Sequence, residues 1–124
     1  MTADKKVLII DDDSRNIFAL KAVLKAKGYS IVSATEAREG INILLADATI
    51  KVVLMDMMMP DIDGYEAISM IRNNSAIAGS IIIAVTAQAM VGDKEKCLAA
   101  GANDYVSKPV DIDALSGLLN RYLN

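Results

Sequence analysis

The sequence predicts an α/β fold: a three-layer α/β/α sandwich around a five-stranded parallel sheet. Two observations predict it. A short apolar run followed by an amphipathic stretch occurs five times along the 124 residues, and the apolar runs are continuous, as is typical of strands that helices cover on both faces. Strand–helix alternation of this kind gives parallel strands joined by right-handed crossovers. A chain of this length suits one domain, which we expect to span residues 1–124.

The strands are expected at the short apolar runs, since a run of this length is typical of a buried strand. In chain order these are Lys6–Ile10, Ser30–Ala34, Val52–Met55, Ile81–Val85 and Asp104–Val106. No low-complexity tract or longer repeat interrupts the series. The order of secondary structure is therefore a simple alternation from one end of the chain to the other.

Helices are expected in the stretches between the strands, where apolar residues recur at helical spacing. They are Ser14–Lys27, Glu36–Ala46, Tyr65–Asn73, about Asp93–Ala100 and Ile112–Leu123. The apolar face of the first helix is widened by Phe18 and Val23. Asp111 is expected to cap the last helix at its N-terminus, and Gly28 and Gly101 stand where C-terminal caps belong.

The composition excludes several classes of function. A net charge of −3 and a pI near 4.8 argue against nucleic-acid binding by the chain itself, because that binding depends on neutralising phosphates. No leader pattern and no apolar run near the length of a membrane span is visible, and the single Cys97 suits a reducing compartment, so we expect a cytoplasmic protein that does not bind membranes. Histidine is absent, which excludes a histidine base or zinc ligand and any donation of a phosphoryl group from the chain's own histidine.

Carboxylates follow two of the apolar strands. Asp11 and Asp12 come directly after the first strand, and Asp56 ends the third. Because ligands of open parallel sheets collect at the carboxyl ends of the strands, we expect these side chains to meet at one edge. Like charges held that close repel unless a cation lies among them, so the sequence predicts a divalent metal site. Asp13, in contrast, is interpreted as the N-cap of the first helix.

Further polar residues follow the remaining strands, and together the set resembles a known family. Thr86 follows the fourth strand and Lys108 the fifth. The receiver domain of bacterial response regulators carries an acidic pair, an aspartate before a Pro and Asp-Gly loop, a Ser/Thr-Ala pair, an aromatic residue and Lys-Pro. Here these are Asp11-Asp12, Asp56-Met57-Met58-Met59-Pro60-Asp61-Ile62-Asp63-Gly64, Thr86-Ala87, Tyr105 and Lys108-Pro109. The resemblance extends from Lys5 to Leu123 and implies a flavodoxin-like strand order 2-1-3-4-5.

The resemblance implies a magnesium ion as cofactor. It places Asp12 and Asp56 as direct ligands, Asp11 as a ligand mainly through water, and the backbone carbonyl of Met58 as another ligand. The chemistry agrees, because Mg²⁺ prefers oxygen ligands, binds few carboxylates and leaves positions for phosphate oxygens. The run of methionines around Asp56 is interpreted as core and loop packing, since thioethers do not suit Mg²⁺.

The resemblance also implies the chemistry of phosphoryl transfer. Asp56 would be the nucleophile that forms an acyl phosphate, with Thr86 donating a hydrogen bond to one phosphoryl oxygen and Lys108 pairing with another. Thr86 would then move toward the phosphoryl group and Tyr105 would turn inward, changing the surface around the fourth helix, fifth strand and fifth helix. Tyr105 as an ordinary half-buried strand residue remains an alternative. The Lys108–Pro109 bond resembles one that is cis in receivers.

We therefore expect a signalling module, not an enzyme in its own right. Its expected partners are a histidine kinase or histidine phosphotransfer protein as donor and a protein effector downstream, with a monomer or a phosphorylation-dependent dimer as the oligomeric state. A free-standing receiver and a fragment of a hybrid kinase both stay open. So does the lifetime of the phosphoryl group, because Met58 and Gln88 occupy the two family positions that tune it.

Two other functions stand as alternatives. A haloacid dehalogenase-type phosphohydrolase also uses an aspartyl phosphate and Mg²⁺, but it predicts a second acid where this chain has Met58 and a cap domain for which 124 residues leave no room. A pseudo-receiver that serves only as an unphosphorylated adaptor is the other alternative. The complete set of Asp11, Asp12, Asp56, Thr86 and Lys108 argues against it.

Overall fold

A computed structural model of the chain describes residues 6–87 and 92–123. Its centre is a five-stranded parallel sheet in the order β2-β1-β3-β4-β5, as predicted. The strands are β1 (Lys6–Ile10), β2 (Ser30–Ala34), β3 (Val52–Asp56), β4 (Ile81–Thr86) and β5 (Asp104–Ser107). The fold is the flavodoxin-like three-layer sandwich that the sequence predicts.

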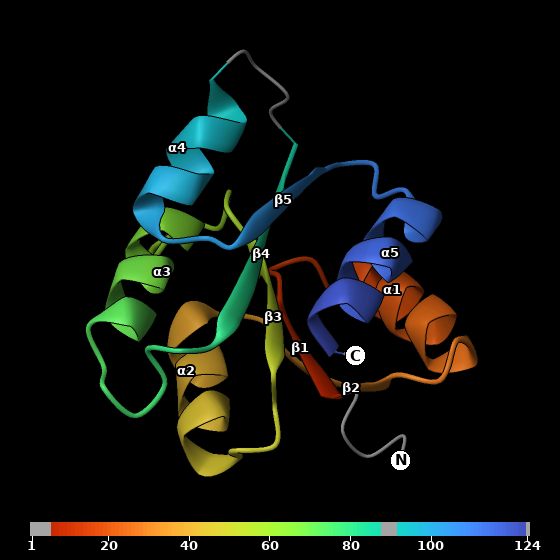
Figure 1. Cartoon of the computed structure of the whole chain (residues 1–124), viewed down its shortest axis with the longest axis horizontal. Helices are drawn as coiled ribbons and strands as arrows, with labels where there is room; N and C mark the ends of the chain where they lie inside the picture. The colour runs from red at the N-terminus through yellow and green to blue at the C-terminus, as the bar shows by residue number, and fades with distance from the viewer. Residues whose placement is uncertain (1–5, 88–91, 124) are drawn as a thin grey trace.

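Helices cover both faces of this sheet (Figure 1). They are α1 (Ser14–Ala26), α2 (Ala37–Ala46), α3 (Gly64–Arg72), α4 (Asp93–Ala100) and α5 (Ile112–Leu123). Figure 1 shows α1 and α5 together on one face and α2, α3 and α4 on the other. None of the helices in the described ranges is long and apolar enough to cross a membrane.

The core has two parts, one on each face of the sheet. One lies under α1 and α5 and includes Ile17, Leu24 and Leu119, and the other lies under α2, α3 and α4. All five residues of β3 are buried, which agrees with its continuous apolar sequence. Apart from Tyr29, the buried hydrophobic side chains are aliphatic residues, methionines and Cys97, so the core is the aliphatic one that the composition predicts.

The predicted caps are confirmed. The Asp13 side chain accepts a hydrogen bond from the backbone N–H of Arg15 at 2.9 Å, and Asp111 accepts one from that of Asp113 at 3.0 Å. Gly28 follows α1 with φ +98°, and Gly101 ends α4 with φ +118°, in the left-handed region that ends many helices.

The structure corrects the prediction at several boundaries and on one helix face. α1, α2 and α3 each differ by a residue at one or both ends, and β3, β4 and β5 each extend one residue further than expected. More importantly, Phe18 and Val23 do not widen the buried face of α1, because the Phe18 side chain is 76% exposed and Val23 38%. Phe18 lies about 100° around the helix from buried Ile17, on the side turned away from the sheet.

Candidate functional site

The register of the sheet brings four strand ends to the same level. Ile10 of β1 pairs with Met55 of β3, so the residues that follow them, Asp11 and Asp56, emerge side by side. Asp56 in turn pairs with Val85 of β4, and Thr86 pairs with Ser107 of β5. Lys108 comes directly after that pair. The predicted site residues therefore meet because the parallel strands end at the same edge of the sheet. The positions of these residues at strand ends in the sequence predicted this meeting.

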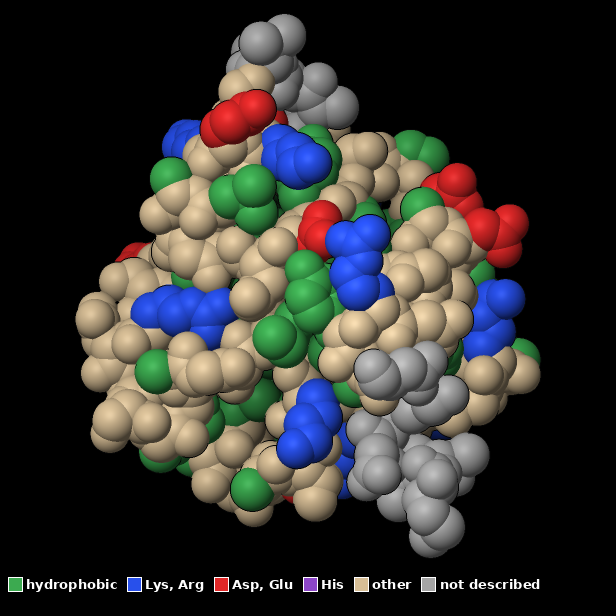
Figure 2. All heavy atoms as spheres, in the orientation of Figure 1, with side chains coloured by type: hydrophobic (Ala, Val, Ile, Leu, Met, Phe, Trp, Pro, Cys, Tyr) green, Lys and Arg blue, Asp and Glu red, His purple; other side chains and the backbone are tan. Residues whose placement is uncertain are grey.

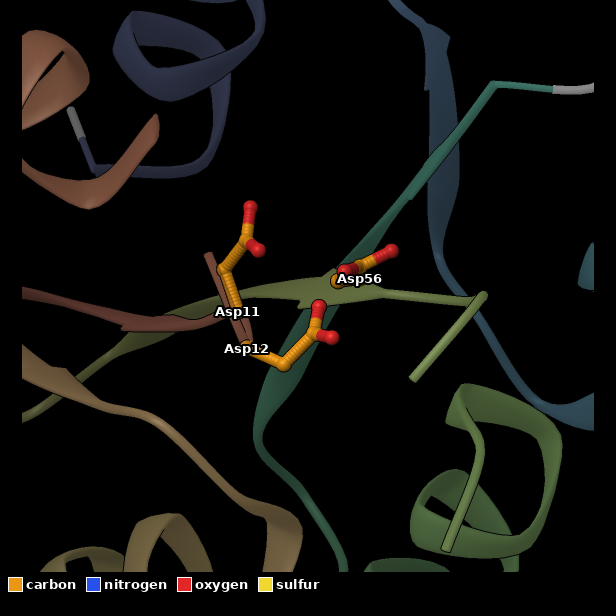
Figure 3. A group of neighbouring side chains, drawn as sticks. All are labelled: Asp11, Asp12 and Asp56. Atoms are coloured by element: carbon orange, nitrogen blue, oxygen red, sulfur yellow. The ribbon is translucent and has the colours of Figure 1, made fainter. Parts of the chain in front are cut away.

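The three acidic residues form one cluster (Figure 3). Carboxylate oxygens of Asp11, Asp12 and Asp56 all lie within 4.8 Å of one another. Asp11 and Asp12 come from the segment after β1 and Asp56 from the end of β3, as Figure 3 shows. Asp11 and Asp56 are each only 3% exposed, whereas Asp12 lies at the surface. Two buried carboxylates next to each other are unfavourable unless other charges compensate them.

Two backbone hydrogen bonds hold the buried carboxylates in place. Asp11 Oδ1 accepts from the N–H of Asp13 at 2.8 Å, and Asp56 Oδ1 accepts from the N–H of Met58 at 3.0 Å. Each bond closes a short turn two residues after the acid, of the kind that aspartate favours. The side chains are thus oriented by their own loops.

The ammonium group of Lys108 faces this cluster. Lys108 Nζ lies 3.7 Å from Asp11 Oδ2 and 3.7 Å from Asp56 Oδ1. Its backbone N–H donates to the carbonyl oxygen of Thr86 at 2.8 Å, which ties the segment after β5 to the end of β4. The Lys108–Pro109 peptide bond is cis, as the resemblance implied. A single ammonium group thus faces two carboxylates from different strands.

The charge balance of the site is reflected in the pKa of Asp56. The pKa of its carboxyl group is raised to about 6, mainly by burial and in part by the Asp11 charge, while the Met58 N–H and Lys108 oppose the rise. The raised pKa indicates that Lys108 only partly offsets the burial of the acids and the charge that they share. The cluster offers only oxygen donors, two of them buried, which fits a hard divalent cation such as Mg²⁺.

The family follows from this geometry and from comparison with known proteins. The family model described as "Response regulator receiver domain" matches residues 7–120. This chain belongs to the response regulator receiver domain family.

Receivers similar to this one occur in larger proteins and as solved domains. The chain is 36% identical over 122 residues to hybrid signal transduction histidine kinase I of Dictyostelium discoideum, covering 94% of this chain but 7% of that protein. It therefore spans only a small part of such a curated relative. The receiver domain of sensor histidine kinase PA1611 from Pseudomonas aeruginosa is similar at 32% identity and a TM-score of 0.86, covering 96% of this chain and 97% of that one.

Two solved structures bear on the site by what they contain. The PA1611 receiver was crystallised with a magnesium ion coordinated in its active-site cleft. The receiver domain of Ssk1 from Saccharomyces cerevisiae was co-crystallised with the histidine phosphotransfer protein Ypd1. It is 31% identical to this chain, with a TM-score of 0.85 over 95% of this chain and 88% of that one. The acidic triad of this receiver thus resembles a site that holds Mg²⁺ in a relative.

The loop after Asp56 is tightly packed. Met57 is buried and donates its backbone N–H to the carbonyl of Val85 at 2.9 Å. A Cβ on Gly64 would lie 2.5 Å from Met57 Sδ and 2.8 Å from the carbonyl oxygen of Asp56, so only glycine fits there. Met58, in contrast, is 51% exposed, and its carbonyl as a metal ligand stays a prediction.

Thr86 and Tyr105 occupy the positions that the sequence predicted, with roles that stay predictions. Thr86 is buried at the end of β4. Tyr105 is half-buried in β5, pairs with Ala84 of β4 and packs against the core under α4. Gln88, the second position expected to tune the phosphoryl lifetime, lies outside the described residues.

Sequence reasoning did not find two features near this receiver site. One is a groove of about 600 Å³ beside α1, lined by Leu20 and Val23 of α1, by Val110 after β5, and by Asp11 and Lys108 of the site itself. The exposed Phe18 lies on the same helix. Only the packing of α1 beside the segment after β5 creates this groove, so no local sequence signal could reveal it. The second feature is the contact between α3 and α4, where the Tyr65 hydroxyl lies 3.5 Å from Asp93 Oδ1.

Proposed function

We propose that this receiver accepts a phosphoryl group on Asp56 from a phosphohistidine of a histidine kinase or phosphotransfer protein, in a Mg²⁺-dependent reaction. One observation carries the proposal. The Asp56 carboxylate is buried beside two further carboxylates within 4.8 Å and an ammonium group 3.7 Å away. An anionic nucleophile can attack an anionic donor only if positive charge offsets the repulsion. Lys108 and a cation bound by the carboxylates would supply that charge.

In the transfer, a carboxylate oxygen of Asp56 attacks phosphorus while the phosphorus–nitrogen bond of the phosphohistidine breaks. The electron pair of that bond stays with the departing imidazole, and Asp56 becomes an acyl phosphate. Mg²⁺ held by Asp11, Asp12 and Asp56, with the Met58 carbonyl as a further ligand, would supply neutralisation of the phosphoryl oxygens. Lys108 is close enough to Asp56 to pair with another phosphoryl oxygen.

Thr86 and Tyr105 are proposed to report the new charge. A phosphoryl group adds about −1.5 to −2 charges at Asp56. The Thr86 hydroxyl would hydrogen-bond it, which is supported by the position of Thr86 one residue beyond Val85, the register partner of Asp56. Tyr105 lies one strand away and would follow, which changes the surface around α4, β5 and α5. A downstream protein effector reads this change, either from the monomer or from a phosphorylation-dependent dimer.

The donor is proposed to dock over the α1 side of the site. Asp56 is only 3% exposed, so the histidine of a partner reaches it only if the partner docks directly over this edge of the sheet. The groove with Leu20 and Val23 in its walls is continuous with Asp11 and Lys108. The apolar side chains of Leu20 and Val23 suit an apolar surface on the donor protein. The solved complex of the Ssk1 receiver with Ypd1 supports a partner of this class.

Charge on the rest of the surface agrees with a protein partner. Figure 2 shows lysine and arginine side chains scattered over the face in view, with no broad basic patch. The overall charge of −3 points the same way. Nucleic-acid contact by the receiver itself is therefore not part of the proposal.

The phosphohydrolase and the pseudo-receiver fit the site less well. Met58 stands two residues after Asp56, with an exposed thioether where the hydrolase needs a second acid. A pseudo-receiver has no use for a buried, mutually repelling acidic triad that Lys108 only partly compensates.

The test is the intact mass of the protein after incubation with acetyl phosphate, with and without Mg²⁺. We expect a gain of one phosphoryl group that requires Mg²⁺ and is lost in Asp56→Asn. Asp13→Asn is the matched control, because it changes the neighbouring acid, keeps a good N-cap, and should be phosphorylated like the wild type. No gain from acetyl phosphate or phosphoramidate in the folded wild type would contradict the proposal.

A further inference from the structure

Methionines surround the proposed nucleophile, and one of them differs from the rest in exposure. Met58 lies two residues after Asp56 and is 51% exposed. The other methionines of this segment are buried, namely Met55, Met57 and Met59 at 0%, 1% and 5% exposure. Met70 of α3 is half-buried against the core. Among the methionines in residues 6–87 and 92–123, Met58 therefore has the most accessible side chain.

The backbone of the loop explains this contrast. Met57 is buried and donates its N–H to the carbonyl oxygen of Val85 at 2.9 Å, so it still follows the sheet. Met58 instead donates its N–H to Asp56 Oδ1 at 3.0 Å, in the short turn that ends the strand. This bond holds the main chain of Met58 against the Asp56 carboxylate while its side chain reaches solvent. An accessible thioether thus belongs to a residue that contacts the carboxylate.

Exposure decides which thioether meets an oxidant. Peroxides convert methionine to its sulfoxide, and the sulfur must be accessible for this reaction. A new sulfur–oxygen bond forms and the oxygen–oxygen bond of hydrogen peroxide breaks. The sulfur loses two electrons, and the peroxide is reduced to water. A buried thioether reacts only after the fold opens locally, which costs free energy. Met58 reacts without that opening, because its side chain is already exposed.

The single cysteine of the chain does not compete for the oxidant. Cys97 is 0% exposed, and burial raises the pKa of its thiol. Peroxides attack the thiolate form of cysteine, so a buried thiol with a raised pKa reacts slowly. Among the described sulfur atoms, dilute peroxide is therefore expected to react first with that of Met58.

A sulfoxide next to Asp56 changes what the site can do with water. The thioether is a weak hydrogen-bond acceptor, whereas oxidation makes the side chain polar and adds an oxygen that accepts strongly. In hydrolysis of an acyl phosphate on Asp56, a water oxygen attacks phosphorus, the bond to the carboxylate oxygen breaks, and a proton passes to solvent. An acceptor that orients the attacking water on the adjacent residue speeds this step.

We propose that Met58 is a modification site: peroxides oxidise its thioether to the sulfoxide, and the sulfoxide shortens the lifetime of the phosphoryl group on Asp56. The first half stands on the exposure of the methionines alone. The second half rests on the proposed function and deepens it, since it names a regulation of the same site. The modification is reversible, because methionine sulfoxide reductases restore the thioether.

The modification site is tested by treating the full chain briefly with dilute hydrogen peroxide and sequencing its peptides by mass spectrometry. We expect the sulfoxide of Met58 to form at least about tenfold faster than those of the buried methionines, because the buried ones require local opening. These are Met55, Met57 and Met59. In the chain unfolded by guanidinium chloride, all four should react at similar rates. Equal rates in the folded protein would overturn the modification site.

The effect on lifetime is tested by the decay of the phosphorylated protein. Peroxide-treated and untreated chains are phosphorylated with acetyl phosphate and Mg²⁺, the donor is removed, and the loss of the phosphoryl group is followed by intact mass. We expect the treated wild type to lose it about two- to tenfold faster, as one added hydrogen bond to the water would cause. Methionine sulfoxide reductase should restore the slower rate.

Matched variants assign the effect to one sulfur atom. Met58→Leu keeps an apolar side chain of similar volume, and its rate of decay should not respond to peroxide. Met70→Leu should respond as the wild type does. Met1 and Met90, which lie outside the described residues, are present in both variants, so a response that is lost only in Met58→Leu belongs to Met58.

An unchanged or longer lifetime after oxidation of Met58 would refute the coupling and leave phosphorylation of Asp56 intact. The same acceleration in Met58→Leu would refute it as well. If the untreated wild type gained no phosphoryl group at all, that result would count against the proposed function. The peptide analysis needs no phosphorylation, so it would still decide whether Met58 is the modification site.

Discussion

Lys108 Nζ lies at the same distance, 3.7 Å, from Asp11 Oδ2 and from Asp56 Oδ1. The two carboxylates come from different strands and would repel each other without this ammonium group. Lys108 therefore has a structural role in the resting receiver besides its proposed contact with the phosphoryl group.

Replacing Lys108 should leave the repulsion between the Asp11 and Asp56 carboxylates uncompensated. Without Mg²⁺, Lys108→Met is expected to lower the free energy of unfolding by about 1–3 kcal/mol near neutral pH, less than for a fully buried pair because the lysine is 25% exposed. Mg²⁺ should restore part of the loss, since it also compensates the acids. Urea denaturation with and without Mg²⁺ measures this, with Lys51→Met at an exposed position as the control. A loss that Mg²⁺ leaves unchanged would contradict the explanation.

Asp56 itself should destabilise the fold at neutral pH in the absence of metal. Its pKa is about 6 in the folded state against 3.8 as the ordinary value, so the native state binds the proton more tightly and its stability falls as pH rises from about 4 through 6. Asp56→Asn should therefore raise the free energy of unfolding by about 1–3 kcal/mol at neutral pH and change it little near pH 4. Denaturation at a series of pH values tests this. If Asp56→Asn were less stable than the wild type at neutral pH, the ionised Asp56 would stabilise the fold, and the prediction would be wrong.

The affinity for Mg²⁺ should depend on Asp12 far more than on Asp13. Asp12 lies at the surface of the triad, where it contributes charge to the cluster. Asp12→Asn is expected to weaken Mg²⁺ affinity by about tenfold or more, as loss of a carboxylate near a metal does. Asp13→Asn, whose side chain caps α1, should stay within about twofold of the wild type. Calorimetric titration distinguishes the two, and equal affinities would remove Asp12 from the metal site.

A methyl group at Gly64 should damage the loop that follows Asp56. It would clash with Met57 and with the Asp56 carbonyl, so Gly64→Ala is expected to cost about 2–4 kcal/mol of stability. The same change at Gly117 of α5 meets no atom within 4 Å and should stabilise the protein by about 0.5–1 kcal/mol. Thermal denaturation of the pair measures both. Similar effects at the two glycines would mean that the close approach at Gly64 does not constrain the loop.

Much of this site could be predicted because its residues stand at strand ends. In a parallel sheet, Asp11, Asp56, Thr86 and Lys108 converge at one edge whatever the details of the helices. Phe18 shows the limit of such reasoning. Its hydrophobicity predicts burial, but only the docking of α1 decides which side of the helix meets the sheet.

The features on α4 needed tertiary structure for a different reason. Tyr65 and Asp93 are 28 residues apart and belong to different helices, and nothing in either local sequence marks them as partners. Arg72 likewise has its acceptors in loops that only the fold brings around it. Side-chain contacts between helices depend on packing angles and rotamers, which periodicity does not determine.

The central claim is that Asp56 becomes the phosphorylated residue, and the most direct measurement locates the acyl phosphate. Protein treated with acetyl phosphate and Mg²⁺ is reduced with borohydride, which converts a phosphorylated aspartate to homoserine, and the peptides are sequenced by mass spectrometry. We predict homoserine at position 56, with positions 11, 12 and 13 unchanged. Homoserine at one of the other acids, or at no position in a protein that has gained a phosphoryl group, would contradict the assignment.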